Sequence, residues 1–308
     1  MNDSAAVNIE KIDFKGWPNS YRISNGTVEA VVTGDVGPRV IRYGFIGGQN
    51  LFKEFDQQIG RSGETAWQPR GGHRLWFGPE DIVRTYALDN GPVDIRIDGG
   101  VLVATGAVEP LTGLEKRIAV RMAAEGTAVE LTHRLRNAGS EPFRLAPWSL
   151  TMLAPGGTGI HGLPPRGSYT SNLLPTGPLV LWAYTNLADP RWTVLEKYIA
   201  LRQDPANPSP QKIGSYNRET WGAYLLNGDM FIKRARAAAG PEAFPDYGCT
   251  FETFTNADFL ELETLGPMVE LAPGASVSHT EHWTLDRGVE PAQWTDAGLD
   301  AALAGLVE

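Results

Sequence analysis

The sequence predicts an all-β fold, a large antiparallel β-sandwich with one short helix at its C-terminal end. Apolar and polar residues alternate in many short segments, and glycine, asparagine and proline separate those segments. Only one segment, close to the C-terminus, has helical spacing. Strands with one apolar and one polar face are typical of antiparallel sheets that stack in pairs.

The N-terminal half contains the clearest strand patterns. Asn25-Gly26 separates residues 21–24 from residues 27–33, and this dipeptide is a strong signal for a two-residue hairpin turn. The segment 93–98 alternates cleanly and meets its neighbour at Gly99-Gly100. The strands predicted here are residues 21–24, 27–33, 39–46, 93–98, 101–104, 114–122 and 128–136.

The middle of the chain, residues 154–215, is rich in proline, glycine, serine and asparagine, with tryptophans interspersed. This mixture favours long ordered loops that lie over a sheet. Strand patterns resume at residues 221–226, 230–234, 250–254, 259–264, 268–271 and 279–285, and residues 291–308 are predicted to be helical. We therefore expect one domain over residues 1–308.

Composition excludes several classes of protein. The formal net charge of −9 argues against a surface for nucleic acid or for an anionic membrane. No apolar run reaches the roughly 18 residues of a membrane span, and the N-terminus lacks the pattern of a signal peptide. The single cysteine, Cys249, is compatible with a reducing compartment, so we expect a cytoplasmic protein.

Residues 67–81, WQPRGGHRLWFGPED, form the most unusual stretch of the chain. Its mixture of charged and aromatic residues fits neither a buried strand nor an ordinary solvated loop. Glycine reaches positive φ without steric cost, so Gly71 and Gly72 predict a tight turn. Aromatic faces beside charged hydrogen-bonding groups suit a polyhydroxylated ligand. The alternative is a long connection between two strands, in which the side chains of Trp76 and Phe77 close one end of the hydrophobic core.

Three stretches carry a resemblance to a known family. Residues 70–79, RGGHRLWFGP, are similar to a run in the glucose-6-phosphate 1-epimerase-like branch of the galactose-mutarotase-like superfamily. Residues 129–142, VELTHRLRNAGSEP, resemble a strand and turn found across that superfamily, and residues 259–285 resemble its closing unit. The resemblance implies the large β-supersandwich of aldose 1-epimerases and related sugar-binding proteins.

In the epimerases a glutamate removes a proton from the anomeric hydroxyl while a histidine protonates the ring oxygen. The resemblance implies Glu263 as that glutamate, with Glu261 on the same strand face as its near rival. The position of the acid histidine falls within residues 143–151, which contain none, and Trp148 stands in that neighbourhood. A replacement acid has to come from elsewhere in the chain.

The five histidines differ in what their positions allow. His73 is the leading substitute acid, and its alternative is a histidine that caps a turn. His133 alternates with leucines and is more typical of a core histidine. His279 and His282 fall on opposite faces of one strand, so they cannot both point into one site. His161 lies in a glycine-rich segment and predicts little.

Glu261 and Glu263 share one face of their strand, while Leu260 and Leu262 take the other. On a solvent face they are ordinary surface charges; in a cleft they raise each other's pKa, which suits acid–base work. No regular spacing of oxygen ligands supports a metal, so no metal and no cofactor is expected. The candidate binding residues are Arg70, Arg74, Trp76, Glu80, Glu261, Trp148 and Lys212.

The sequence thus predicts a carbohydrate-binding protein with a small-molecule sugar as its partner and with no nucleic acid or membrane partner. As an enzyme it would be an isomerase of the aldose 1-epimerase kind, with Glu263 as base and His73 as acid. One alternative is a sugar-binding or sensing protein without activity, and a second is an oligosaccharide lyase or hydrolase on the same scaffold. Whether identical chains associate is left open.

Overall fold

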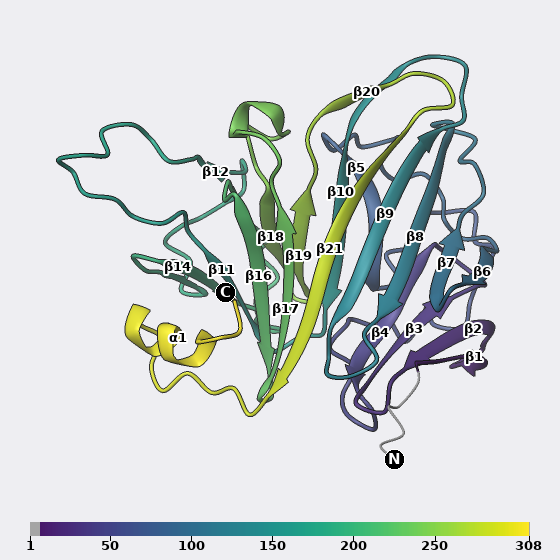
Figure 1. The fold of residues 1–308 in the computed structure, drawn as a ribbon, viewed down its shortest axis with the longest axis horizontal. Coiled ribbons are helices and arrows are strands. Elements are labelled where there is room, and N and C mark those ends of the chain that lie inside the picture. Colours follow the sequence, from purple (N-terminus) through teal and green to yellow (C-terminus); the bar gives the residue numbers. More distant parts are fainter. Residues whose placement is uncertain (1–6, 308) are drawn as a thin grey trace.

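A computed structural model describes residues 7–307 as two large antiparallel sheets that pack face to face (Figure 1). This arrangement confirms the predicted all-β sandwich. Residues 1–6 and 308, which the predicted domain includes, lie outside the described residues. Strands from the two halves of the chain meet in the second sheet, where β21 (Ser276–Arg287) pairs with β9 (Val129–Asn137).

The first sheet has eleven strands, and β10 (Phe143–Leu153) lies near its middle between β5 and β19. Its order is β1 (Asn8–Phe14), β2 (Trp17–Ser24), β3 (Val28–Thr33), β4 (Arg39–Phe45), β5 (Gly72–Gly78), β10, β19 (Leu260–Leu265), β18 (Phe251–Thr255), β15 (Gln211–Ser215) and β12 (Leu179–Leu181). The short β20 (Val269–Leu271) pairs with the start of β10.

The second sheet has ten strands, with β17 and β21 in its middle. Its order is β13 (Trp192–Val194), β14 (Tyr198–Arg202), β11 (Thr158–Gly162), β16 (Glu219–Leu226), β17 (Asp229–Arg236), β21, β9, β8 (Leu114–Met122), β7 (Val101–Thr105) and β6 (Asp94–Asp98).

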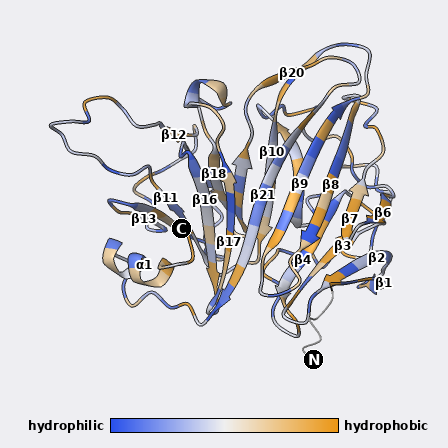
Figure 2. Ribbon diagram, in the orientation of Figure 1, coloured by the Kyte–Doolittle hydropathy of each residue, from blue (hydrophilic) through white to orange (hydrophobic). Residues whose placement is uncertain are grey.

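The main hydrophobic core lies between the two sheets, and period-two alternation places it there. Along β8 and β9 every second residue is buried, and hydrophobic and hydrophilic residues are interspersed on both strands (Figure 2). Trp283 of β21 packs edge-on against Phe52 and Phe231, with ring centroids 5.5 and 5.4 Å away. The strands predicted from alternation are confirmed within a few residues at their ends.

The C-terminal helix is shorter than predicted. Helix α1 (Asp296–Leu303) begins after Thr295, whose hydroxyl accepts a hydrogen bond from the backbone N–H of Gly298. Leu299 and Leu303 pack on the second sheet in a cluster with Ile160 and Ile232, on the side opposite the main core. A short 3-10 helix, η1 (Pro241–Ala243), is the only other helical element among the described residues.

The prediction that residues 67–81 avoid a buried strand is wrong. Residues 72–78 form β5, and all seven of them are buried. The strand tolerates its polar residues because the second sheet covers one of its faces and aromatic side chains cover the other. The predicted turn before it is present, with φ of 82° at Gly71 and 70° at Gly72. A Cβ on Gly71 would lie 1.8 Å from the Lys53 carbonyl oxygen, so glycine is required there.

The middle of the chain contains more strand than predicted. Residues 154–215 include β11 to β15. The longest connection among these five strands runs from β11 to β12 and projects from one side of the molecule (Figure 1). In the described chain no helix is long and apolar enough to cross a membrane.

Candidate functional site

A cleft opens on the face of the first sheet that points away from the second sheet. Residues that are partners on neighbouring strands project from the same face of the sheet, so the strand register arranges the cleft residues in rows across the strands. Arg74, Leu150, Glu263 and Glu252 are successive partners across β5, β10, β19 and β18. The next row runs through Met152, Glu261, Phe254 and Lys212, and a third pair is Trp76 with Trp148.

Aromatic side chains form one wall of the cleft. Trp76 packs against Trp148 and Tyr86, with ring centroids 5.4 and 4.9 Å away, and Trp67 lies 5.8 Å from Trp76. The Arg74 guanidinium stacks on this group, 3.9 Å from the Trp76 ring centroid. Such rings present flat apolar faces, which is the surface that the C–H face of a sugar ring requires.

Glu261 contributes a carboxyl group to the opposite side of the cleft and is 7% exposed. Burial raises the pKa of Glu261 to about 8, and the nearby Glu263 charge adds to the shift. The carboxyl is therefore mostly protonated at neutral pH. Burial also lowers the pKa of Arg74 to about 10, so its guanidinium stays charged there.

Glu263 lies beneath the cleft with no exposed surface. Its Oε2 accepts hydrogen bonds from Trp148 Nε1 at 2.7 Å and from Lys212 Nζ at 3.0 Å. Lys212 also pairs with Glu252 Oε2 at 2.7 Å. Burial lowers the pKa of Lys212, but the Glu252 and Glu263 charges outweigh burial and hold this pKa well above its ordinary value. The ammonium group therefore stabilises negative charge at the floor of the cleft.

Several buried polar atoms of the cleft have no hydrogen-bond partner among residues 7–307. They are Trp67 Nε1, Arg74 Nε and Nη1, and the Oε1 atoms of Glu252, Glu261 and Glu263. An unsatisfied buried polar atom costs roughly 1–3 kcal/mol, and native structures contain few of them. Their concentration beside one hollow of about 260 Å³ leaves hydrogen-bonding capacity that a polar ligand could satisfy.

The structure brings most of the predicted binding residues together, although they come from five strands or loops. Those that line the cleft are Arg74, Trp76, Glu80, Trp148, Lys212 and Glu261. Arg70 is the exception. Its guanidinium is buried against Glu64 and donates to Asn90 Oδ1 at 2.9 Å and to the Arg61 carbonyl at 2.7 Å. Arg70 thus fixes the loop that precedes β5.

His73 does not share the cleft with Glu263. It follows Gly72 on β5 and pairs with Thr151, so its side chain points to the face opposite Arg74 and Glu263. It is fully buried between the sheets. An acid that acts on a ligand in the cleft therefore has to be another residue. His73 belongs to segment 67–81, which does contribute to the cleft, but the sequence alone does not determine which face of β5 points into the cleft.

The polar residues around His73 form a second group, here called the inter-sheet cluster: His73, His133, Thr151, Lys233 and Glu281. All five are buried. His133 Nδ1 lies 3.0 Å from the His279 carbonyl oxygen, so this nitrogen carries the proton. The neutral His133 Nε2 then accepts from His73 Nε2 at 2.7 Å, and His73 Nδ1 accepts from the Thr151 hydroxyl at 2.9 Å. One chain of hydrogen bonds satisfies both rings.

Glu281 supplies the negative charge of this cluster. It pairs with Lys233 Nζ at 2.8 Å and accepts from Trp283 Nε1 at 2.9 Å. Burial alone would raise the pKa of Glu281, but Lys233 reverses this and holds it well below the usual range. In the described chain, His73, His133 and Glu281 are the one group whose donor atoms approach metal-site spacing, within 4.8 Å. Hydrogen bonds and Lys233 already satisfy them.

The cleft also contains residues that the sequence did not single out. They are Trp67, Tyr86, Tyr184, Phe254, Asn256 and Phe259. Trp67 is the first residue of segment 67–81, and Phe259 precedes Glu261 and Glu263 on the same part of the chain. The others stand on separate strands and loops, and no pattern in the sequence relates them to residues 67–81.

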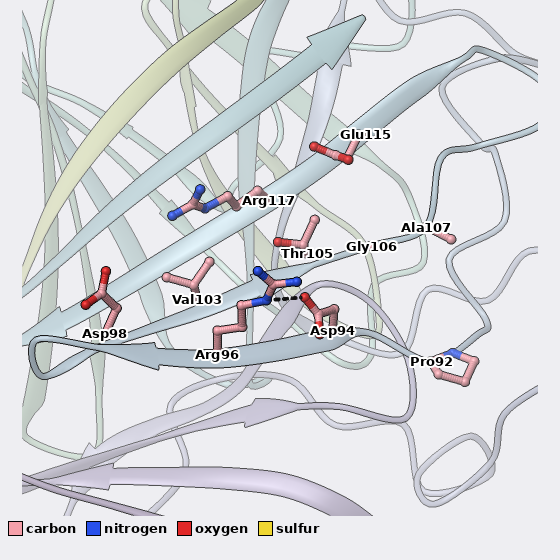
Figure 3. Close-up of a pocket in the computed structure, with 10 residues that line it drawn as sticks. All are labelled: Pro92, Asp94, Arg96, Asp98, Val103, Thr105, Gly106, Ala107, Glu115 and Arg117. Atoms are coloured by element: carbon pink, nitrogen blue, oxygen red, sulfur yellow. Dashed lines mark hydrogen bonds and ion pairs between the residues drawn. The ribbon is translucent and has the colours of Figure 1, made fainter. Parts of the chain in front are cut away.

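A larger depression lies elsewhere, over β6, β7 and β8 (Figure 3). It has a volume of about 630 Å³ and is lined by charged side chains such as Asp94, Arg96 and Arg117. The Arg96 side chain is 78% exposed and pairs with Asp94 at 2.9 Å. No lining residue of this depression carries a buried unpartnered polar atom in the described chain. The depression therefore lacks the features that mark the cleft.

Comparison with known proteins supports the fold. No model of a known protein family matches the sequence, and no curated protein matches it. A solved galactose mutarotase-like protein from Lactobacillus casei ATCC 334 is similar over 86% of this chain and 99% of its own, at 9% identity and a TM-score of 0.55. The Slr1438 protein from Synechocystis sp. PCC 6803 is similar over 90% of this chain and 99% of its own, at 11% identity and a TM-score of 0.54.

A galactose mutarotase-like protein from Clostridium acetobutylicum is similar over 93% of this chain and all of its own, at 11% identity and a TM-score of 0.51. Identities this low establish a shared fold and leave the activity to be argued from the site. The chain has the galactose mutarotase-like fold, as its sequence motifs predicted.

Proposed function

We propose that this chain binds a sugar in the cleft, and that Glu261 and Glu263 exchange protons with its anomeric centre. The observation that carries the proposal is the set of buried, unpartnered polar atoms beside aromatic rings that pack edge to face. A pyranose is complementary to both features: its hydroxyls donate and accept hydrogen bonds with the polar atoms, and its apolar C–H face packs on the aromatic rings.

The two carboxyl groups suit opposite roles. Glu261, whose pKa is about 8, holds a proton at neutral pH and is the donor. Glu263 is the acceptor, since Lys212 and Trp148 stabilise its charged form and its Oε1 is unpartnered within residues 7–307. A neutral carboxyl group beside a carboxyl group that is hydrogen-bonded to an ammonium is an arrangement typical of acid–base pairs.

The reaction follows from these roles. Glu263 accepts the proton of the anomeric hydroxyl, and Glu261 donates its proton to the ring oxygen. The bond between the anomeric carbon and the ring oxygen breaks, which leaves an open-chain aldehyde. Rotation about the neighbouring carbon–carbon bond and the reverse transfers close the ring as the other anomer and return both protons. Arg74 and Trp76 hold the sugar during these steps.

Anomer exchange in freshly dissolved α-glucose and α-galactose, followed by NMR, tests the proposal. The protein should accelerate exchange, and Glu261→Gln and Glu263→Gln should each slow it by about 100- to 10,000-fold. Glu270→Gln, on the exposed side of β20, is the matched control and should keep the full rate. Exchange should also weaken above about pH 8, because Glu261 then loses its proton.

A second candidate is a sugar-binding protein without catalytic activity. The complete burial of Glu263 favours it, because an acceptor must reach the anomeric hydroxyl. Saturable sugar binding with no acceleration of exchange would establish this candidate. Absence of binding across a panel of neutral and phosphorylated sugars would overturn both.

A further inference from the structure

We propose that the ligand is a reducing oligosaccharide, with its reducing-end ring in the cleft and the next ring in a neighbouring second hollow. This inference rests on the proposed function. It assigns the substrate class through a subsite that a monosaccharide would leave empty.

The second hollow continues directly from the cleft. It is lined by Pro79, Glu80, Ile82, Tyr86, Trp182 and Asp246, and it shares Glu80 and Tyr86 with the cleft. The Tyr86 hydroxyl donates to Glu80 Oε1 at 2.5 Å, so these two side chains form the boundary between the hollows. A ligand that leaves the cleft past this pair enters the second hollow.

The volumes favour a ligand that occupies both hollows. The cleft alone holds about 260 Å³, just below the roughly 300–1,000 Å³ of ordinary small-molecule sites. The second hollow adds about 580 Å³ and is open to solvent on its outer side. A single ring therefore fills the first hollow, and a longer ligand uses the second.

The lining of the second hollow has the same chemistry as the cleft. Trp182 and Tyr86 provide aromatic rings, while Glu80 and Asp246 provide carboxyl oxygens for sugar hydroxyls. Ile82 is 89% exposed, an unusual state for a large apolar side chain that a bound ring would cover. Aromatic and acidic groups side by side match a ring with an apolar face and polar edges.

Trp182 is held in place before any ligand arrives. Leu181 pairs with Ile213 in the ladder of β12 and β15, and the Trp182 N–H donates to Thr185 Oγ1 at 3.0 Å. Gly214 leaves space for the Cys249 sulfur and for the indole, because a Cβ there would overlap Sγ and lie 3.2 Å from the Trp182 ring. A platform fixed in this way loses little conformational entropy when it binds.

Lys212 connects the two hollows. Its Nζ lies 4.8 Å from the Trp148 ring centroid in the cleft and 4.7 Å from the Trp182 ring centroid. The ammonium group thus lies between an indole of each hollow. The Asp246 carboxyl lies in the same charged environment, because the Lys212 ammonium that pairs with Glu252 acts on it too. The polar floor is therefore continuous beneath both rings of the proposed ligand.

Isothermal titration of matched ligands tests this subsite. Glucose and galactose are compared with glucose- and galactose-terminated reducing disaccharides of several linkages, on the wild-type chain, Trp182→Ala and Ile82→Asp. We expect at least one disaccharide to bind about tenfold more tightly than its reducing-end monosaccharide, and both variants to remove most of that gain. Their affinity for the monosaccharide should stay within about twofold of wild type, which also shows that they are folded.

Trp294→Ala is the matched control, because Trp294 is partly exposed next to helix α1 and distant in sequence from the cleft residues. It should leave both affinities unchanged. Equal binding of monosaccharides and disaccharides would overturn the second subsite and leave the proposed function standing. A Trp182→Ala variant that lost monosaccharide affinity would also overturn it, since Trp182 would then belong to the first subsite. Failure of every sugar to bind would overturn the proposed function itself.

Discussion

Two buried polar clusters lie back to back on β5 and β10, and they differ in how well their atoms are partnered. The inter-sheet cluster of His73, Thr151, His133, Lys233 and Glu281 has a hydrogen-bond partner for each buried side-chain nitrogen and oxygen within residues 7–307. The cleft on the opposite face leaves atoms of Arg74, Glu252, Glu261 and Glu263 unpartnered there.

The difference separates a satisfied structural network from the proposed binding site. A fully satisfied buried network stabilises one packing arrangement and has no capacity left for a ligand. Unpartnered atoms in the cleft cost stability, and a ligand that satisfies them recovers that free energy as affinity. Burial and polarity alone would have given both clusters the same interpretation.

Removal of Lys233 should produce the largest loss of stability, because it leaves the Glu281 carboxylate buried and unpaired. We expect Lys233→Met to lower the free energy of unfolding by about 3–5 kcal/mol, measured by urea denaturation. The double variant Lys233→Met with Glu281→Gln should regain more than half of this loss. A loss below about 1 kcal/mol in the single variant would contradict the importance of the network.

Mild acid should destabilise the protein through its buried histidines. Burial lowers the pKa of His73 well below its ordinary value, lowers that of His133, and lowers those of His161 and His279 to about 4. All four are neutral in the folded state near pH 6–7 and take up protons only on unfolding. Stability is therefore fully present above the unfolded-state pKa of about 6.5 and falls as pH decreases towards the folded-state pKa.

From pH 7 to pH 6 the histidine contribution falls by at most roughly 0.7 kcal/mol for each histidine, or about 3 kcal/mol for the four. Urea denaturation at the two pH values measures it. His282→Asn is the control, since His282 is exposed and its removal should leave the pH dependence unchanged. Because Glu261 titrates with the opposite sign over this range, the histidine contribution is read as the difference between the wild type and His161→Asn; an identical pH dependence of the two would show that His161 takes up no proton on unfolding.

Removal of the Glu261 carboxyl should have the opposite sign and increase stability. The pKa of Glu261 is about 8 in the folded state because burial penalises its charge, whereas it is about 4.3 when unfolded. This group therefore costs stability as pH rises between these values. We expect Glu261→Gln to raise the free energy of unfolding by about 2 kcal/mol at pH 7 and by less at pH 5.

If Glu261→Gln raises the free energy of unfolding and also slows anomer exchange, the Glu261 carboxyl is a group that serves function at a cost in stability. Equal stability of the variant and the wild type at both pH values would instead indicate that Glu261 is satisfied as it stands. Urea denaturation at pH 5 and pH 7 distinguishes these outcomes.

The exposed pair in the large depression should have the smallest effect. Arg96→Ala removes the contact with Asp94, and both side chains are well exposed. We expect a change within about 0.5 kcal/mol in the free energy of unfolding and no change in sugar affinity. A loss of sugar binding in this variant, measured by titration, would move the site from the cleft to the depression of Figure 3.

Much of the fold could be predicted from local patterns. Alternation located most strands, and Asn25-Gly26 and Gly71-Gly72 marked turns that the structure contains. The candidate glutamates were found on one face of one strand because side chains alternate with a period of two. The buried state of β5 was missed, since residues distant in the sequence hydrogen-bond His73, and aromatic side chains cover Arg74.

The sequence by itself determined the sandwich, the turns, and the pairing of Glu261 with Glu263 on one face of β19, because these depend on local backbone geometry and on alternation. Only the tertiary structure decided which face of each strand became the cleft. It placed Arg74 in the cleft and His73, the next residue before it, in the core. The physical reason is that the register among β5, β10 and β19 and the packing of the second sheet fix the side of each residue. Those contacts join segments almost two hundred residues apart, and no local pattern encodes them.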